Sequence, residues 1–322
     1  MSAQEKKSRL QEILRSYGKV AIAYSSGVDS TFLLKIAHDV LGENAIAVTV
    51  KSNLVPSAEM DEAEAFCARE GIRHIFITHD EMSVPGFAEN PANRCYICKR
   101  QIFSSIQAVA REAFCNTQEV FCAASDRDAH ATSITVCEGS NKDDEGDYRP
   151  GMKAIAELSV KSPLREAGLT KAEIRELSRE LNLATANKPS FACLASRIPY
   201  GQTITRKKLQ LVENAEKFLQ SLGFVQYRVR CKELATEQSQ PVSVQPSIAM
   251  TPQSVTVRAS VATALTASIE LLPEQFELFK IHQETIVSKF IDLGFSQVLF
   301  DEKGYRTGSL NEVLSTKDKQ GI

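Results

Sequence analysis

The sequence predicts an α/β fold: a doubly wound, mainly parallel sheet, followed by a smaller α+β domain. Two observations predict this class. In the first half of the chain, short apolar, β-branched runs alternate with segments of helical periodicity, and strands separated by helices pair in parallel. After residue 185 this alternation stops, and short strand-like runs are flanked by two long helical segments. We therefore expect one domain over 1–185 and a second over 186–322.

Each element of the first domain has its own signal. Residues 1–18 carry apolar side chains at helical spacing, with charges between them, and 57–70 predict a helix with an acidic first turn. Thr170 followed by Glu173 is a capping-box pattern that opens a helix in the mostly helical region 152–183. The other expected helices cover 31–41 and 98–114, and the expected strands cover 19–24, 45–50, 73–78 and 119–124.

The second domain is less regular. A helix over 205–222 ends at Gly223, and a last helix over 278–293 ends at Gly294. The expected strands are 224–230, which alternates in polarity, and 297–300. Two polar segments without a clear pattern, 123–135 and 232–264, are expected to be insertions, and the second is expected to be flexible.

The composition excludes several classes of protein. The chain has 322 residues and a net charge of −2, so it has no global basic field to hold a nucleic acid. The N-terminus lacks the apolar core of a secretory signal, and no apolar run is long enough to span a bilayer. We expect a cytoplasmic protein. Its eight cysteines are then not a disulfide framework, and most are expected to be small buried residues.

A phosphate-binding loop is expected where the first strand meets the first helix of the alternation. Its residues run consecutively: Ser25, Ser26, Gly27, Val28, Asp29 and Ser30. Gly27 permits close backbone approach, and the amides of the turn and of the following helix start point at one spot. Asp29 beside a phosphate makes sense if Mg²⁺ lies between them. The alternative is an ordinary Ser/Gly turn with a helix cap at Ser30.

This loop resembles the S-G-G-x-D-S signature of the PP-loop ATP pyrophosphatases, except that Ser26 replaces the first glycine. That resemblance implies cleavage of ATP between its α and β phosphates. Gly139, Ser140, Asp143 and Asp144 follow a later strand-like run, where PP-loop enzymes close over the nucleotide. We expect this second loop to contact ATP, with Asp143 and Asp29 as candidate Mg²⁺ ligands; an acidic surface turn is the alternative.

Cys193 lies in a Pro-bounded loop, with Lys188 and Arg197 close in sequence. Nearby cations favour the thiolate, which is the nucleophilic form of cysteine. From the residues alone, an inert buried cysteine is an equally good interpretation.

The loop of Cys193, with several other segments, resembles the LarE family of ATP-dependent sacrificial sulfur transferases. The segments run in order along nearly the whole chain: NPANRCYICK (90–99), EGSNKDD (138–144), DYRPG (147–151), SPLREAGLTK (162–171), KPSFACLASRIPYG (188–201), RVR (228–230) and GYR (304–306). The resemblance implies that ATP with Mg²⁺ adenylates a carboxylate of a pyridinium dicarboxylate mononucleotide, in nickel-pincer cofactor biosynthesis. Cys193 then gives up its sulfur to form a thiocarboxylate and becomes dehydroalanine.

The same resemblance implies a substrate-binding set and a homo-oligomer. Four arginines suit a substrate that bears phosphate and carboxylates, and a glutamate on a helix resembles a position linked to substrate or metal. They are Arg94, Arg197, Arg228, Arg230 and Glu216. For each arginine, a solvated surface charge is the alternative. For the elimination step, a base is needed at the Cα proton of the cysteine, and Lys188 or a loop carboxylate is the candidate.

Two features leave rival functions open. Cys95 and Cys98 are half of a metal site by spacing, so zinc, or an iron–sulfur cluster with Cys193 as third ligand, is an alternative to plain helix-start cysteines. Ala186 and Ser268 stand where the family has tryptophan and arginine. The rival functions are a transfer-RNA thiolase, an ATP-dependent amide synthetase and a non-catalytic nucleotide-binding protein.

Overall fold

The computed structural model describes residues 1–115, 134–145, 150–189, 192–233, 264–306 and 308–315. The chain divides into two compact units. Unit 1 comprises 1–194, 203–205 and 311–322, and unit 2 comprises 195–202 and 206–310. The predicted boundary at residue 185 stays a prediction. Within the described ranges, no helix combines the length and the apolar character needed to cross a membrane.

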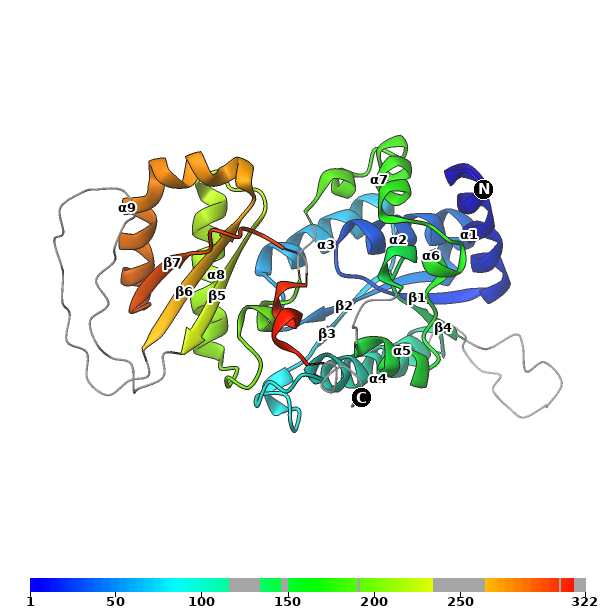
Figure 1. The fold of residues 1–322 in the computed structure, drawn as a ribbon. Coiled ribbons are helices and arrows are strands. Elements are labelled where there is room, and N and C mark those ends of the chain that lie inside the picture. The colour runs from blue at the N-terminus through cyan, green and yellow to red at the C-terminus, as the bar shows by residue number, and fades with distance from the viewer. Residues whose placement is uncertain (116–133, 146–149, 190–191, 234–263, 307, 316–322) are drawn as a thin grey trace, which may run out of the picture. The chain divides into compact units, whose positions relative to one another are not determined.

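Unit 1 contains a parallel sheet, as the fold class predicts. Its strands are β1 (Lys19–Ala23), β2 (Ala45–Lys51), β3 (His74–Thr78) and β4 (Ile134–Cys137), in the order β3-β2-β1-β4 (Figure 1). All three pairings are parallel. Because β1 has β2 on one side and β4 on the other, the connections reverse direction between β1 and β4. The carboxyl ends of these two strands form the switch point at which such sheets bind ligands.

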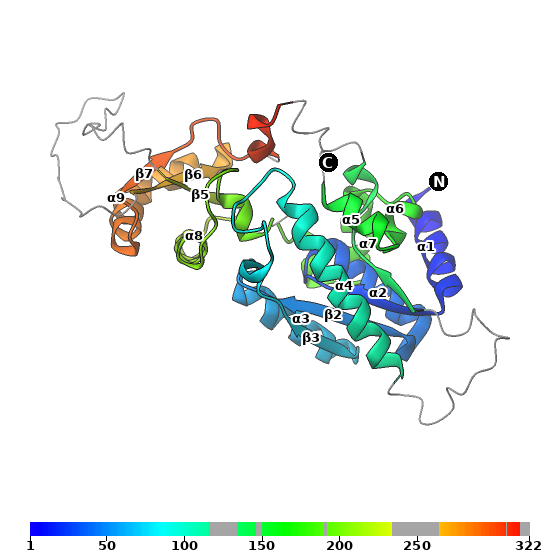
Figure 2. The same ribbon diagram turned by 90° about the horizontal axis from the view of Figure 1, so that it is seen from below.

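Helices cover both faces of this sheet, which confirms the predicted α/β class (Figure 2). One face packs on α1, α2, α3, α6 and α7, and the other on α4 and α5. Their bounds are α1 (Ala3–Tyr17), α2 (Val28–Leu41), α3 (Ser57–Glu70), α4 (Arg94–Cys115), α5 (Gly151–Glu157), α6 (Pro163–Glu166) and α7 (Lys171–Glu180). The predicted capping box is present, because Thr170 Oγ1 accepts from the Glu173 amide at 3.3 Å.

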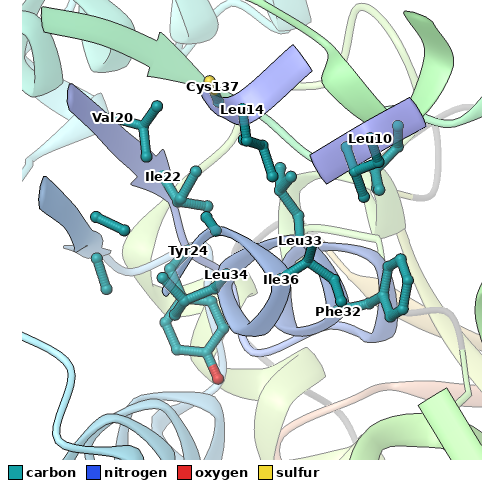
Figure 3. Packing of buried hydrophobic residues seen from close by; sticks show 14 of the residues in the cluster. Leu10, Leu14, Val20, Ile22, Tyr24, Phe32, Leu33, Leu34, Ile36 and Cys137 are labelled. Atoms are coloured by element: carbon teal, nitrogen blue, oxygen red, sulfur yellow. The ribbon is translucent and has the colours of Figure 1, made fainter. Parts of the chain in front are cut away.

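The core beneath α1 and α2 holds the predicted phosphate loop in place (Figure 3). Leu10 and Leu14 of α1 pack with Phe32 and Leu33 of α2 against Ile22 of β1, and all five side chains are fully buried. Burying one such side chain contributes about 1.5–3 kcal/mol. The strand end and the helix start that carry the loop are therefore rigid parts of the core.

The fourth strand differs from the prediction. The predicted strand 119–124 lies outside the described residues, whereas β4 includes the last two residues of the segment 123–135, which was expected to be an irregular insertion. The strand is only four residues long, too short for its alternation to stand out in the sequence. Val136 nevertheless packs toward α4 and α5, and Cys137 packs toward α1 and α2.

Unit 2 contains a separate three-stranded sheet, β5 (Tyr227–Glu233), β6 (Leu265–Leu271) and β7 (Gln297–Phe300), with α8 (Arg206–Ser221) and α9 (Phe276–Leu293) packed on it. The central strand β6 pairs antiparallel with β5 and parallel with β7. Strand β6 was not predicted, because its sequence LTASIEL mixes polar and apolar residues, yet all seven residues are buried. Strand β5 extends to Glu233 and so enters the segment 232–264; the rest of that segment lies almost entirely outside the described residues.

Candidate functional site

The predicted phosphate loop, residues 25–30, joins β1 to α2 at the switch point of the sheet. Gly27 is the N-cap residue of α2, and no side chain of the described residues caps this helix end. Its first N–H groups are therefore left for another acceptor, which is the arrangement that binds anions. The hydroxyls of Ser25 and Ser30 lie 3.1 Å apart, and the Ser30 hydroxyl also accepts from the Ser25 amide at 3.3 Å. These contacts give the loop a fixed shape.

Ser26 holds the loop to α3. Its φ of 52° lies in the left-handed region, which explains why a glycine is the usual residue at this position of the signature. The Ser26 hydroxyl donates to the Glu59 carboxylate at 2.6 Å and lies 3.0 Å from the Glu59 carbonyl oxygen. The conformation that glycine would adopt is thus reached by serine, with a side-chain bond that offsets the strain.

Asp29 points toward α7 and the loop after β4. One carboxylate oxygen accepts from the Lys171 ammonium, and the other accepts from the Asn141 amide at 3.4 Å. Asp143 accepts from the backbone N–H of Lys171 at 2.8 Å, so the two candidate Mg²⁺ ligands meet at the same residue. Burial raises the pKa of Asp29, and the charge of Lys171 opposes that rise. A divalent cation would therefore have to displace Lys171 from Asp29.

The second loop lies against the first. A Cβ added at Gly139 would lie 3.1 Å from the Ser30 amide nitrogen, so only a glycine fits without movement. The Ser140 hydroxyl donates to the buried Glu138 carboxylate at 2.7 Å, and the Asp144 carboxylate accepts from the backbone N–H of Asn141 at 2.9 Å. In this structure Ser140 and Asp144 shape the loop.

Lys188 connects the phosphate loop to the segment that carries Cys193. Its ammonium donates to the carboxylates of Glu59, at 2.7 Å, and Glu62, and reaches the Ser26 carbonyl oxygen at 3.3 Å. Arg175 of α7 fixes the backbone of the same segment by donating to the Lys188 carbonyl oxygen at 2.7 Å. An ammonium that donates to three acceptors has no lone pair for a proton, so this geometry favours a positioning role over the role of base.

Cys193 is exposed, and its neighbours include both cysteines of α4. Burial raises the pKa of Cys95 and Cys98, and the charge of Cys193 raises both further. The amide of the next residue, Leu194, donates to the Leu54 carbonyl oxygen at 3.0 Å. Within the described ranges, no three His, Cys, Asp or Glu side chains are arranged to hold a metal ion.

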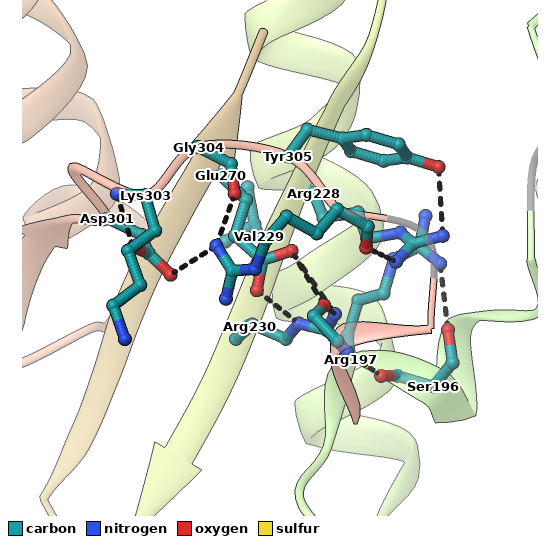
Figure 4. Close-up of polar contacts among 12 residues, drawn as sticks. Ser196, Arg197, Arg228, Val229, Arg230, Glu270, Asp301, Lys303, Gly304 and Tyr305 are labelled. Carbon is teal, nitrogen blue, oxygen red and sulfur yellow. Dashed lines mark hydrogen bonds and ion pairs between the residues drawn. The ribbon is translucent and has the colours of Figure 1, made fainter. Parts of the chain in front are cut away.

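In unit 2, three arginines form a buried polar cluster (Figure 4). Arg197, Arg228 and Arg230 are 1%, 8% and 4% exposed, so they are not solvated surface charges. Arg197 makes two bonds to the Glu216 carboxylate, at 2.8 and 3.1 Å, and Arg230 makes two to the Glu270 carboxylate, at 2.8 and 3.2 Å. Glu216 orients Arg197 and also accepts from a β5 amide.

Arg228 differs from its two neighbours. Its guanidinium lies over the Tyr305 ring, donates to the Tyr305 hydroxyl at 2.9 Å, and reaches the Arg306 carbonyl oxygen at 3.3 Å. No carboxylate of the described residues forms an ion pair with it. Two paired arginines and one without a carboxylate leave a net positive charge in a buried setting, which favours an anion.

Several residues bonded to the predicted site residues give no signal of their own in the sequence. Lys171, Glu59 and Glu270 lie in unremarkable positions of the sequence, and only the motif SPLREAGLTK hinted at Lys171. Arg94 lies in unit 1, at the first residue of α4; it is 2% exposed and donates to Asn90. It belongs to a different unit from the other three arginines.

Comparisons with known proteins assign the family. No protein-family model matches the chain. The chain is 35% identical over 313 residues to an uncharacterized protein of Synechocystis sp., covering 96% of this chain and 98% of the relative. It is 31% identical over 311 residues to the pyridinium-3,5-bisthiocarboxylic acid mononucleotide synthase of Lactiplantibacillus plantarum, covering 96% and 95%. An uncharacterized protein of Methanocaldococcus jannaschii is 22% identical over 303 residues. With its motifs in order along this whole length, the chain belongs to the LarE family.

Proposed function

We propose that the chain is an ATP-dependent sulfur transferase. It adenylates a carboxylate of a pyridinium dicarboxylate mononucleotide and converts it to a thiocarboxylate with the sulfur of Cys193. One observation carries the proposal: Lys188, five residues before Cys193, is bonded to the phosphate loop and to Glu59, which is itself bonded to that loop. ATP must activate the same carboxylate that the thiol then attacks. The contacts of Lys188 hold the segment that leads to Cys193 against the loop predicted to bind ATP.

Adenylation is supported by the phosphate loop. The N–H groups at the start of α2 suit the phosphates of ATP, and Lys171 suits the charge that builds up on the leaving pyrophosphate. Asp29 and Asp143 would hold Mg²⁺, a cation that prefers oxygen ligands and would neutralise the phosphate charge. The substrate carboxylate attacks the α-phosphorus, pyrophosphate leaves, and the carboxylate becomes an acyl-adenylate.

Substrate binding is supported by the arginine cluster of unit 2. Arg228, with no carboxylate partner among the described residues, suits the phosphate of the mononucleotide. Arg197 and Arg230 are held in place by Glu216 and Glu270, so their planes are fixed before an anion arrives. Arg94 of unit 1 remains a further candidate for a carboxylate.

Sulfur transfer follows in two steps. The Cys193 thiolate attacks the acyl carbon, AMP leaves, and a thioester forms. A base then removes the Cα proton, the Cβ–S bond breaks, and the sulfur stays on the substrate as a thiocarboxylate. The protein is left with dehydroalanine at position 193. A cytoplasmic location and a homo-oligomeric state are part of the same proposal.

The test is the intact mass of the protein after incubation with ATP, Mg²⁺ and the dicarboxylate nucleotide. We expect a loss of about 34 Da, the mass of H₂S, mapped to residue 193. Cys193→Ser should still release pyrophosphate but keep its mass. The matched control is Cys115→Ser, because Cys115 is also exposed but lies at the end of α4. This control should lose mass like the wild type.

Other results would overturn parts of the proposal. Pyrophosphate release with unchanged mass would move the sulfur source away from Cys193, and iron and sulfide analysis would then test a cluster on the three cysteines. Pyrophosphate release only with transfer RNA or with ammonia would indicate the thiolase or the synthetase. ATP binding without any pyrophosphate would indicate a non-catalytic nucleotide-binding protein.

A further inference from the structure

Glu81 is a buried carboxylate with no evident structural function. It opens the 3-10 helix η2 (Glu81–Ser83) of unit 1 and is 1% exposed. Within the described residues, neither of its carboxylate oxygens has a hydrogen-bond partner. A buried charged group without a partner costs several kcal/mol, so folded proteins retain such groups where they serve a purpose.

Glu81 and the segment that carries Cys193 share neighbouring residues. The Ser52 hydroxyl lies beside the Glu81 carboxyl, and two residues later the Leu54 carbonyl oxygen accepts from the amide that follows Cys193. Cys98 is a neighbour of both, because the charges of Cys193 and of Glu81 each act on its thiol. The segment after β2 therefore brings the carboxylate and the cysteine loop together.

The other carboxylates around the two loops are occupied. Asp29 binds Lys171, and Glu59 and Glu62 bind Lys188. Glu138 accepts from two serine hydroxyls. Glu81 alone among the buried carboxylates described has both oxygens without a hydrogen bond.

We propose that Glu81 is the base that removes the Cα proton of Cys193 in the elimination that releases the sulfur. This inference rests on the proposed function. The Cα–H bond breaks and its proton goes to a Glu81 oxygen. The electron pair of the Cα–H bond forms the Cα=Cβ double bond, the Cβ–S bond breaks, and the sulfur leaves with the Cβ–S electron pair, remaining on the substrate as a thiocarboxylate. No oxidant or reductant is consumed.

Burial suits Glu81 to this step. Removing a carboxylate from water raises the pKa of Glu81, against smaller opposing effects of its own backbone N–H, of Ser52 and of His79. A carboxylate with a raised pKa is a stronger base.

The first experiment compares the wild type with Glu81→Gln in the intact-mass assay. The variant should release pyrophosphate and form the thioester, and then stop. Its mass should rise by one acyl group, removable by hydroxylamine, and dehydroalanine should form at least about 100-fold more slowly. Glu81→Asp should form dehydroalanine at an intermediate rate, because it keeps a carboxylate but holds it farther back on a shorter side chain. Glu89→Gln is the matched control, since Glu89 is exposed in the same stretch of chain.

The second experiment needs no nucleotide. Cyanylation of Cys193 turns its sulfur into a leaving group, and loss of thiocyanate gives dehydroalanine by the same removal of the Cα proton. We expect this loss to be fast in the wild type and in Glu89→Gln, and slow in Glu81→Gln. Peptide mapping at residue 193 separates it from reactions of the other cysteines.

Three results would overturn the proposal. Dehydroalanine at the wild-type rate in Glu81→Gln would exclude Glu81 as the base. If Glu81→Gln released pyrophosphate but formed no thioester, Glu81 would act in the earlier attack of the thiol and not in the elimination. Equal thiocyanate loss in all proteins would show that Glu81 does not act at the Cα proton. Failure of the proposed function gives a different result: the wild-type protein itself would keep its mass after incubation with ATP, Mg²⁺ and the nucleotide substrate.

Discussion

At the scale of single residues, Ser26 shows how a departure from a signature is accommodated. The signature has glycine because the turn needs a positive φ, and Ser26 has a φ of 52°. The strain of a left-handed non-glycine residue is about 1–2 kcal/mol. A hydrogen bond to a charged group contributes about 1.5–3 kcal/mol, so the bond from Ser26 to Glu59 offsets it. The loop therefore keeps the shape that glycine would give it.

We predict that Ser26→Ala and Ser26→Gly are both less stable than the wild type, because both lose the bond to Glu59. Ser26→Ala should be the less stable of the two by about 0.5–1 kcal/mol, since it keeps the strained φ without the bond. Urea unfolding measures both. Pyrophosphate release by Ser26→Gly should match the wild type within about threefold, because the turn is unchanged. A large gain in Ser26→Gly would mean instead that the serine distorts the loop.

At the scale of elements, strands β5 and β6 carry the arginine cluster between them. Arg228 is paired in register with Glu270, and Arg230 with Ser268. The ion pair between Arg230 and Glu270 thus runs diagonally across the two strands, and the position opposite Arg230 holds a small residue. Ser268 carries no charge, so the carboxylate that pairs with Arg230 is that of Glu270, two residues along β6.

We predict that Arg230→Met destabilises the protein by about 3–5 kcal/mol, because it leaves the Glu270 carboxylate buried without its partner. The double variant Arg230→Met with Glu270→Leu should recover most of that loss. Neither protein should bind the nucleotide substrate like the wild type in calorimetry. Lys280→Met, in the exposed pair with Glu277, is the control and should change stability by less than about 1 kcal/mol. A double variant with wild-type affinity would remove Arg230 from the substrate site.

At the scale of the whole molecule, the described part of the chain tolerates costly buried charge near its loops. Burial raises the pKa of Asp29 and of Glu81, and both lie at loops that the proposed reaction uses. The carboxyls of Glu70 and Glu173 show the opposite: hydrogen bonds and charge from neighbouring lysines lower their pKa, although burial acts against this. The first pair weakens the fold at neutral pH, and the second pair strengthens it.

We predict the pH dependence that Glu81 imposes. A raised pKa means that the folded protein holds the proton more tightly than the unfolded chain. Stability is therefore lost as pH rises from the ordinary carboxyl range through the raised pKa, and it stays lower above that. Glu81→Gln should equal the wild type near about pH 4 and become more stable than it as pH rises to about 8. Urea unfolding over this pH range measures the difference in unfolding free energy between the two proteins. The contributions of Glu70 and Glu173 are the same in both proteins and cancel in this difference. A difference that does not vary with pH would contradict the prediction.

The sequence by itself determined the fold class and the family, and it predicted a phosphate-binding loop where the first strand meets the following helix. These depend on local patterns: strand-loop-helix at Ser25–Ser30, the segment around Cys193, and motifs in order along the chain. Tertiary structure decided which charges meet, because the pairs of Lys171 with Asp29 and of Lys188 with Glu59 join residues more than a hundred positions apart. It also decided the burial of Glu81 and the existence of β6, whose polar residues hide it from periodicity. Local spacing encodes elements, whereas burial and pairing depend on how distant elements pack.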